Sequence, residues 1–185
     1  MTPAVTDGEA PMRYCVQPAT AKDVAILALA MADEDAGDVE FDRDSDSEVE
    51  QRPLDHLLNA FLSSTEVWAA HDPKGQPCAL WGVGPTSQDL EVGRFWLLTC
   101  EEVETQPRDL AALSTIVLPE MLTTYTRLES IVDSQNQRAL SLLQGLGFTV
   151  EPPAFHETSG RQCHRVWIEA DASSLVVPNR PGLLN

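Results

Sequence analysis

The stretch from Leu128 to Phe148 constrains the fold of this chain more than any other part of the sequence. It opens with an apolar run, LESIV, which is typical of a buried strand. Asp133 and Ser134 follow as turn and helix-cap residues, and Gly145 and Gly147 end the pattern where a left-handed cap favours glycine. Between them, apolar residues recur at helical spacing. These residues are Ala139, Leu140, Leu142, Leu143 and Leu146. The stretch therefore predicts a β-α-β unit.

The length and composition indicate one globular domain without a membrane span. The chain has 185 residues, of which 43% are hydrophobic, and this is enough to bury one sizeable core. It contains no run of about 18 apolar residues, so no membrane span is expected. The opening residues, MTPAVTDGEAPMR, contain neither a basic leader nor an apolar stretch. We therefore expect no secretory signal.

The cysteines and histidines show no metal-binding spacing. The four cysteines are far apart and never form C-x-x-C, so we expect reduced, half-buried thiols and neither a zinc site nor a disulfide framework. The four histidines are equally scattered, which predicts no metal site. His71 beside Asp72 is interpreted as a surface turn residue, with a base at a strand end as the alternative. The cysteines and histidines are Cys15, Cys78, Cys100, Cys163, His56, His71, His156 and His164.

The net charge of −17 is concentrated in one segment. Between Asp33 and Glu50 lie ten carboxylates and a single basic residue, Arg43. Such a chain repels the phosphate backbone, so no direct contact with nucleic acid is expected. The run DRDSDSE lacks the glycine and the ligand positions of a calcium-binding EF-hand loop. Residues 33–52 are therefore predicted to form an acidic loop that faces solvent or a partner.

The hydrophobic periodicity predicts an α/β order of β-α-α-β-β-β-α-β-α-β-β. Residues 1–12 are predicted to form an arm and residues 171–185 an extended tail. Helices are expected after Thr20, from Pro53, from Pro107 with a bend at Pro119, and after Asp133. Strands are expected at 14–18, 66–70, 77–83, 94–99, 128–132, 148–150 and 164–169.

This order and several sequence phrases resemble the GNAT acetyltransferase fold across residues 13–170. The phrases are VQPAT with Asp23, the hairpin VWAA…ALWGV, the strand FWLLT, and DSQNQRALSLLQGLGF. They look most similar to GNAT-like proteins of tailed phages, a group that includes an internal virion protein of short-tailed phages. The resemblance implies an α/β fold with a central mixed, twisted sheet flanked by about four helices.

The resemblance also implies a site for the pyrophosphate of acetyl-CoA, built from backbone N–H groups at a helix start. The family motif there is Q/R-x-x-G-x-G/A, and this chain offers QPRDLA from Gln106. Gln106 and Ala111 fit the outer positions, and Arg108 adds a cation, so these three are the cofactor-binding candidates of an active enzyme. Asp109 replaces the central glycine, however, and Pro107 removes a donor.

The family also uses a tyrosine that protonates the leaving thiolate. The corresponding position in this sequence is occupied by Leu143. Tyr125 is expected to pack with a satisfied hydroxyl. Glu66 and Glu91 flank the central strands, where the fold sometimes places a base, and no local pattern distinguishes them. The strand tryptophans are interpreted as core or edge packing, with a ligand platform as the alternative. These are Trp68, Trp81, Trp96 and Trp167.

The two missing devices favour a catalytically degenerate domain that serves as a structural or interaction component of a phage particle. Such a protein would be made in the host cytoplasm, would bind other virion proteins through the acidic loop 33–52 and the tail 171–185, and is expected in several copies. It would use no cofactor, metal, nucleic acid or membrane. The alternative is an active N-acetyltransferase that uses acetyl-CoA and modifies a host or phage amine. A third reading is a non-catalytic binder of a small ligand between the fourth and fifth strands.

Overall fold

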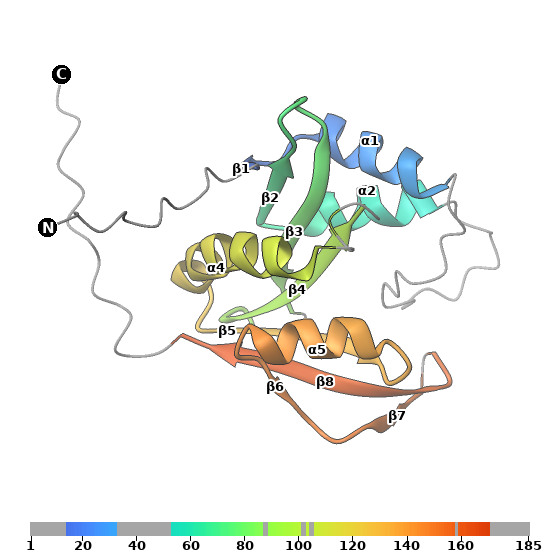
Figure 1. Cartoon of the computed structure of the whole chain (residues 1–185). Helices are drawn as coiled ribbons and strands as arrows, with labels where there is room; N and C mark the ends of the chain where they lie inside the picture. Colours follow the sequence, from blue (N-terminus) through green and yellow to red (C-terminus); the bar gives the residue numbers. More distant parts are fainter. Residues whose placement is uncertain are drawn as a thin grey trace, which may run out of the picture.

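A computed structural model of the chain describes residues 14–32, 53–86, 89–100, 103, 106–157 and 159–170 (Figure 1). The arm 1–12, the acidic loop 33–52 and the tail 171–185 lie outside these residues, so their predictions stay predictions. The described helices are α1 (Ala21–Ala32), α2 (Pro53–Ser63), α4 (Pro107–Thr124) and α5 (Gln137–Gly145). None of them is long and apolar enough to span a membrane.

Eight strands form one mixed sheet in the spatial order β1-β2-β3-β4-β5-β8-β6, and β7 also pairs with β8. All pairings are antiparallel except that of β4 with β5. The strands are β1 (Cys15–Pro18), β2 (Glu66–His71), β3 (Pro77–Pro85), β4 (Val92–Thr99), β5 (Arg127–Asp133), β6 (Thr149–Val150), β7 (Ala154–His156) and β8 (Arg161–Glu169).

The predicted element order is confirmed with one addition. Strand β7 was not predicted, because three residues after Pro152-Pro153 show no alternation that a sequence pattern can detect. It pairs with the early part of β8, which begins at Arg161 rather than at the predicted His164. Helix α4 runs continuously through Pro119, so the proline does not end it.

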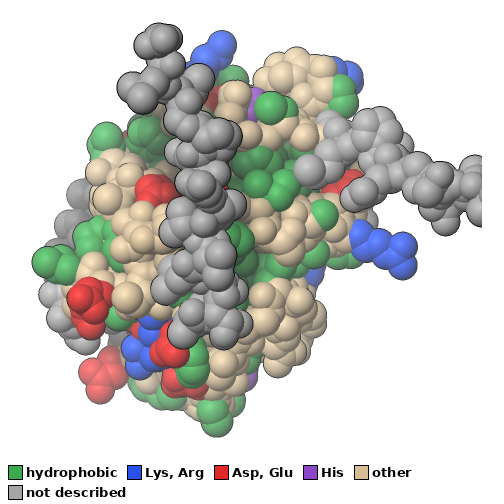
Figure 2. All heavy atoms as spheres, turned by 90° about the vertical axis from the view of Figure 1, so that its left-hand side faces the viewer, with side chains coloured by type: hydrophobic (Ala, Val, Ile, Leu, Met, Phe, Trp, Pro, Cys, Tyr) green, Lys and Arg blue, Asp and Glu red, His purple; other side chains and the backbone are tan. Residues whose placement is uncertain are grey.

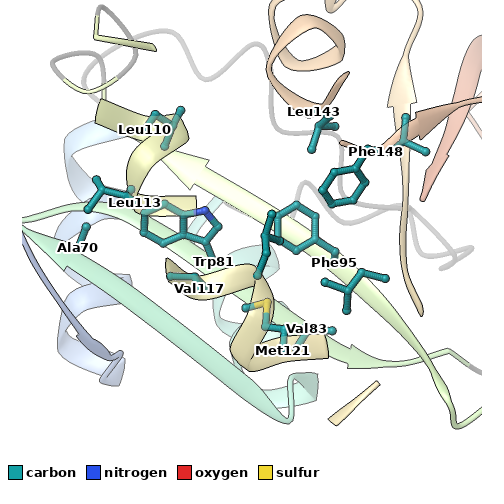
Figure 3. Packing of buried hydrophobic residues seen from close by; sticks show 14 of the residues in the cluster. Ala70, Trp81, Val83, Phe95, Leu110, Leu113, Val117, Met121, Leu143 and Phe148 are labelled. Atoms are coloured by element: carbon teal, nitrogen blue, oxygen red, sulfur yellow. The ribbon is translucent and has the colours of Figure 1, made fainter. Parts of the chain in front are cut away.

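Helices cover the two faces of the sheet differently (Figure 1). On one face, α1 and α2 pack on Ala69, Leu80 and Leu98. On the other face, α4 and α5 pack in a larger cluster around Trp81 and Phe95 (Figure 3). Ala69 and Ala70 of β2, and Leu80 and Trp81 of β3, fall in different clusters, as the two-residue period of a strand requires. Strand β3 is therefore buried on both faces, whereas the edge strand β1 is largely exposed.

Two local signals at helix ends had different outcomes. The helix expected after Thr20 is present and begins with a capping box, in which the Asp23 carboxylate accepts hydrogen bonds from the Thr20 backbone N–H (2.8 Å) and hydroxyl (2.7 Å). The predicted cap of α5 at Asp133-Ser134 is wrong. Asn136 caps this helix by accepting a bond from the Ala139 N–H (3.0 Å), whereas Asp133 accepts one from the Gln135 N–H and shapes the preceding turn.

Glycine is required where strands approach other groups closely. The indole of Trp96 lies across Gly82, its partner on β3, so any side chain at Gly82 would overlap the ring. The Trp96 indole N–H donates to the Ser64 hydroxyl at 2.9 Å, which fixes the ring over the glycine. Gly147 has a φ of +92°, which confirms the predicted left-handed residue after α5.

Candidate functional site

The two parallel strands at the centre of the sheet pair over only three residues. Val92, Gly93 and Arg94 of β4 face Arg127, Leu128 and Glu129 of β5. Beyond this point β4 continues to Thr99 and β5 to Asp133 without further pairs between them. The strands therefore diverge toward their C-terminal ends. We call residues 95–99 and 130–133 the β4–β5 wedge.

Apolar side chains of β4, α5 and the residue before β6 lie together at the start of the wedge (Figure 3). The rings of Phe95 on β4 and Phe148 beside β6 lie 5.6 Å apart between centroids, tilted by 37°. Leu110 from α4 and Leu143 from α5 belong to the same buried cluster. On the side covered by α4 and α5, the wedge therefore begins in the hydrophobic core.

The start of α4 is the part of the site that was predicted to hold phosphate. Gln106 occupies the N-cap position without a side-chain capping bond, and Pro107 is the first helical residue. The N–H groups of Asp109 and Leu110 both donate to the Gln106 carbonyl, at 3.0 and 3.2 Å. Because proline has no N–H, Arg108 supplies the one N–H of this first turn for which the described residues record no acceptor.

The three predicted cofactor-binding residues lie in this same turn. The side chain of Arg108 is exposed, those of Gln106 and Ala111 are half-buried, and Asp109 is half-buried between them. Arg108 makes no ion pair within the described residues, so its charge does not offset Asp109 through a direct contact. The turn therefore places one carboxylate and one cation around a single open backbone donor.

The candidate acids and bases have structural partners. Leu143, at the position of the family tyrosine, is 5% exposed and packs in the core. Tyr125 is 4% exposed, and its hydroxyl hydrogen-bonds the Thr65 hydroxyl, which confirms the prediction for this residue. Glu66 accepts a hydrogen bond from the Thr124 hydroxyl. No acid or base side chain occurs on β4 except Arg94, which is itself in contact with other groups.

The interpretation of His71 as a surface turn residue is wrong. It ends β2, is 7% exposed, and its Nε2 lies 3.0 Å from Oδ1 of Asp23 on α1. Its Nδ1 is buried without a partner among the described residues. Because Asp23 also accepts from Thr20, the carboxylate joins the start of α1 to the end of β2 at one corner of the sheet. The pair is buried beneath α1 and does not face the wedge, so we assign it a structural role.

This corner makes stability depend on pH. Partial burial raises the pKa of the Asp23 carboxyl, but hydrogen bonds from His71 and Thr20 outweigh that effect and hold the pKa below 3.8. A lowered pKa stabilises the fold above pH 3.8, and this contribution is lost as the pH falls through the folded-state value. Asp23→Asn is expected to lower the free energy of unfolding by about 1 kcal/mol at neutral pH and by progressively less in acid. Denaturant titrations across pH measure this difference.

The matched control for that experiment is Asp55→Asn on α2, because Asp55 is exposed and makes no side-chain hydrogen bond among the described residues. The decrease in the free energy of unfolding caused by Asp55→Asn should be small and should change little with pH. If Asp23→Asn lowered the free energy of unfolding by the same amount down to strongly acidic pH, the stabilisation could not come from the Asp23 carboxylate.

His156, His164, Trp81 and Trp167 make side-chain hydrogen bonds. His164 Nδ1 lies 2.7 Å from the Glu151 carbonyl, and His156 Nδ1 lies 3.2 Å from the Ser159 hydroxyl. Trp81 and Trp167 donate to Ser114 and Glu151. Trp68 buries its indole N–H without a partner among the described residues. Within the described ranges, no three His, Cys, Asp or Glu side chains come together in a metal-binding arrangement.

Comparison with solved structures identifies the fold. A probable GNAT-family acetyltransferase from Chromobacterium violaceum superposes with a TM-score of 0.63 at 17% identity, covering 91% of this chain and 94% of that one. A GCN5-related N-acetyltransferase from Kribbella flavida gives 0.62 at 16% identity, with coverage of 87% and 100%. A GNAT-family acetyltransferase from Streptococcus pneumoniae gives 0.58 at 15% identity, with coverage of 85% and 99%.

These structures have the GNAT fold, and this chain shares it, which confirms the predicted fold class. At identities below 20% the likeness concerns the arrangement of the backbone only. No protein-family model matches the sequence, and no curated protein matches it significantly.

Proposed function

We propose that this chain is an acetyltransferase-fold domain that has lost catalysis and acts by binding other proteins. The observation that carries the proposal is the first turn of α4. A phosphate-binding helix start needs several free N–H groups and no nearby anion, but here proline removes one donor, and among the described residues a single N–H of the turn has no acceptor. A carboxylate at Asp109 about 4 Å from a phosphate oxygen would cost on the order of 4 kcal/mol near a protein surface.

The absence of a general acid at the expected place supports the same proposal. Leu143 cannot transfer a proton, and its burial in the core leaves no room for a reacting group at that position. Tyr125 follows the last residue of α4, and its hydroxyl is hydrogen-bonded to the Thr65 hydroxyl. Binding of the donor and protonation of the thiolate would thus both lack their usual residues.

The partners we propose are other proteins of a phage particle, and this part rests on the sequence resemblance. The acidic loop 33–52 and the tail 171–185 are the proposed contact segments, the first for a basic surface and the second by extended docking. Figure 2 shows acidic and basic side chains interspersed on one face of the described domain, without a continuous basic area. A domain of this charge is proposed to contact neither nucleic acid nor membrane.

Deleting residues 171–185 is expected to abolish incorporation of the protein into particles, because an extended segment would lose its main-chain and side-chain contacts together. The measurement is the amount of the truncated protein in purified particles by quantitative mass spectrometry. Deletion of residues 1–12, which are not proposed as a contact segment, serves as the control. Full incorporation of the tail-deleted protein, with an unchanged melting temperature, would reject the tail as the contact.

The second candidate function is an active N-acetyltransferase. The specific observation in its favour is the β4–β5 wedge, because two parallel strands that diverge leave main-chain groups of residues 95–99 and 130–133 unpaired between them. Under this alternative Gln106, Arg108 and Ala111 would hold acetyl-CoA, and the acidic composition would suit a cationic amine acceptor.

A further inference from the structure

A polar hollow of about 540 Å³ lies at the end of the sheet, beside the turn that connects β5 to α5. Its lining residues are Asp133, Ser134, Gln135, Gly160, Arg161 and Gln162. They come from the end of β5, the turn before α5, and the β7–β8 hairpin. In the order of the sheet this hollow is on the β8 side of β5, whereas the β4–β5 wedge is on the opposite side. Its size falls in the usual range for small-molecule sites.

The two charged groups of the hollow neutralise each other. Arg161 donates to the Asp133 carboxylate at 3.2 Å, and the Gln135 backbone N–H donates to the other carboxylate oxygen at 2.7 Å. The hydrogen bond from the Gln135 N–H has the largest effect and holds the pKa of Asp133 below its usual value; desolvation opposes it, and the hydrogen bond and charge of Arg161 add smaller lowering effects. The carboxylate is thus ionised and paired at neutral pH. A ligand with a net charge of either sign gains little here.

The uncharged side chains of the hollow are open to a ligand. Ser134, Gln135 and Gln162 make no side-chain hydrogen bond within the part of the chain that the structure describes. Each carboxamide carries two N–H donors and one acceptor oxygen, and the hydroxyl both donates and accepts. The hollow therefore offers donors and acceptors in alternation around a neutral ion pair.

An exposed aromatic ring stands next to these groups. Phe155 is 63% exposed and lies directly opposite Gln162 in the β7–β8 ladder. Residues paired in this way project from the same face with Cβ atoms about 5 Å apart. A large apolar ring left in solvent beside a polar hollow has an apolar face available for a ligand.

We propose that this hollow binds a neutral saccharide, of one or two sugar units. Sugar hydroxyls donate and accept at once, which matches the mixed carboxamide, hydroxyl and ion-pair lining. The apolar C–H face of a pyranose ring packs on the exposed ring of Phe155. The lack of net charge at the Asp133–Arg161 pair selects a neutral ligand over a phosphate or an amine. This site is independent of the proposed loss of catalysis, since it shares none of the residues of α4.

The test is a backbone NMR titration of the full-length, ¹⁵N-labelled protein with neutral sugars: glucose, galactose, mannose, N-acetylglucosamine and their disaccharides. At least one of them is expected to bind with a dissociation constant in the millimolar range and to shift the signals of residues 133–135 and 160–162. Glucosamine, glucuronate and inorganic phosphate are the charged probes and should bind at least tenfold more weakly.

Three variants locate the contact without disturbing the core. Phe155→Ala is expected to weaken saccharide binding at least tenfold, whereas Leu62→Ala, which removes an even more exposed apolar side chain from α2, should leave it unchanged. Phe155→Tyr should keep the affinity within about twofold, because the stacking ring remains. The proposal is overturned if no neutral sugar shifts these signals, if a charged probe binds more tightly, or if Phe155→Ala binds as well as the parent.

Discussion

Trp81→Ala is expected to lower the free energy of unfolding by about 3–5 kcal/mol, the usual cost of emptying a buried aromatic site. Trp81 lies in the middle of β3, has no exposed surface, and packs against α4 in the larger core cluster (Figure 3). Its indole N–H donates to the Ser114 hydroxyl at 3.0 Å, and that hydroxyl donates to the Leu110 carbonyl at 2.8 Å. The side chain thus joins the sheet to the helix that carries the candidate site.

Denaturant unfolding with linear extrapolation measures this loss. Two further variants separate packing from hydrogen bonding. Ser114→Ala leaves the volume almost intact but strands the buried indole N–H, at a cost of about 1–3 kcal/mol. Leu62→Ala, on the exposed side of α2, should change stability by less than about 0.5 kcal/mol. A Trp81→Ala loss below about 1 kcal/mol would show that β3 and α4 are not held together by this contact.

The sequence was most informative where the cause of a structure is local. The capping box of Thr20 and Asp23 and the leucine spacing before Gly147 depend on residues three or four positions apart. Each such signal has a physical cause within one turn of chain, and each is present in the structure. The order of strands and helices followed from these signals together.

Features that depend on distant residues could not be predicted in this way. His71 follows the hydrophobic run of β2 and precedes a turn, which is typical of a surface residue. Its burial depends on Asp23, which is 48 positions earlier in the chain. Likewise β7 forms because β8 offers it a partner strand.

The candidate site combines both kinds of information. The replacement of a glycine by Asp109 and of a tyrosine by Leu143 is visible in the sequence once the family motif is aligned. The geometry around these two positions is not visible in the sequence. Only the structure places Asp109 and Leu110 N–H groups on the Gln106 carbonyl and ends the β4–β5 pairing after Arg94. The hollow beside Phe155 also gave no sequence signal, because its residues come from two separate turns.

Acetyl-CoA is expected to bind this protein at least a thousandfold more weakly than a micromolar ligand, a difference of about 4 kcal/mol. The cause is the first turn of α4, which combines a carboxyl side chain at Asp109 with a donor lost at Pro107. The double variant Pro107→Ala, Asp109→Gly removes both obstacles and is expected to recover part of the affinity. Ile116→Ala, on the exposed side of the same helix, is the matched control and should recover none.

The measurement that tests the loss of catalysis most directly is calorimetric titration of the full-length protein with acetyl-CoA, repeated with coenzyme A. The account predicts no binding heat, and no rise in melting temperature with ligand at millimolar concentration. Saturable binding with a dissociation constant in the micromolar range, worth about 8 kcal/mol, would contradict it. Asp109 would then have to point away from the phosphates, and the active N-acetyltransferase would become the function to pursue.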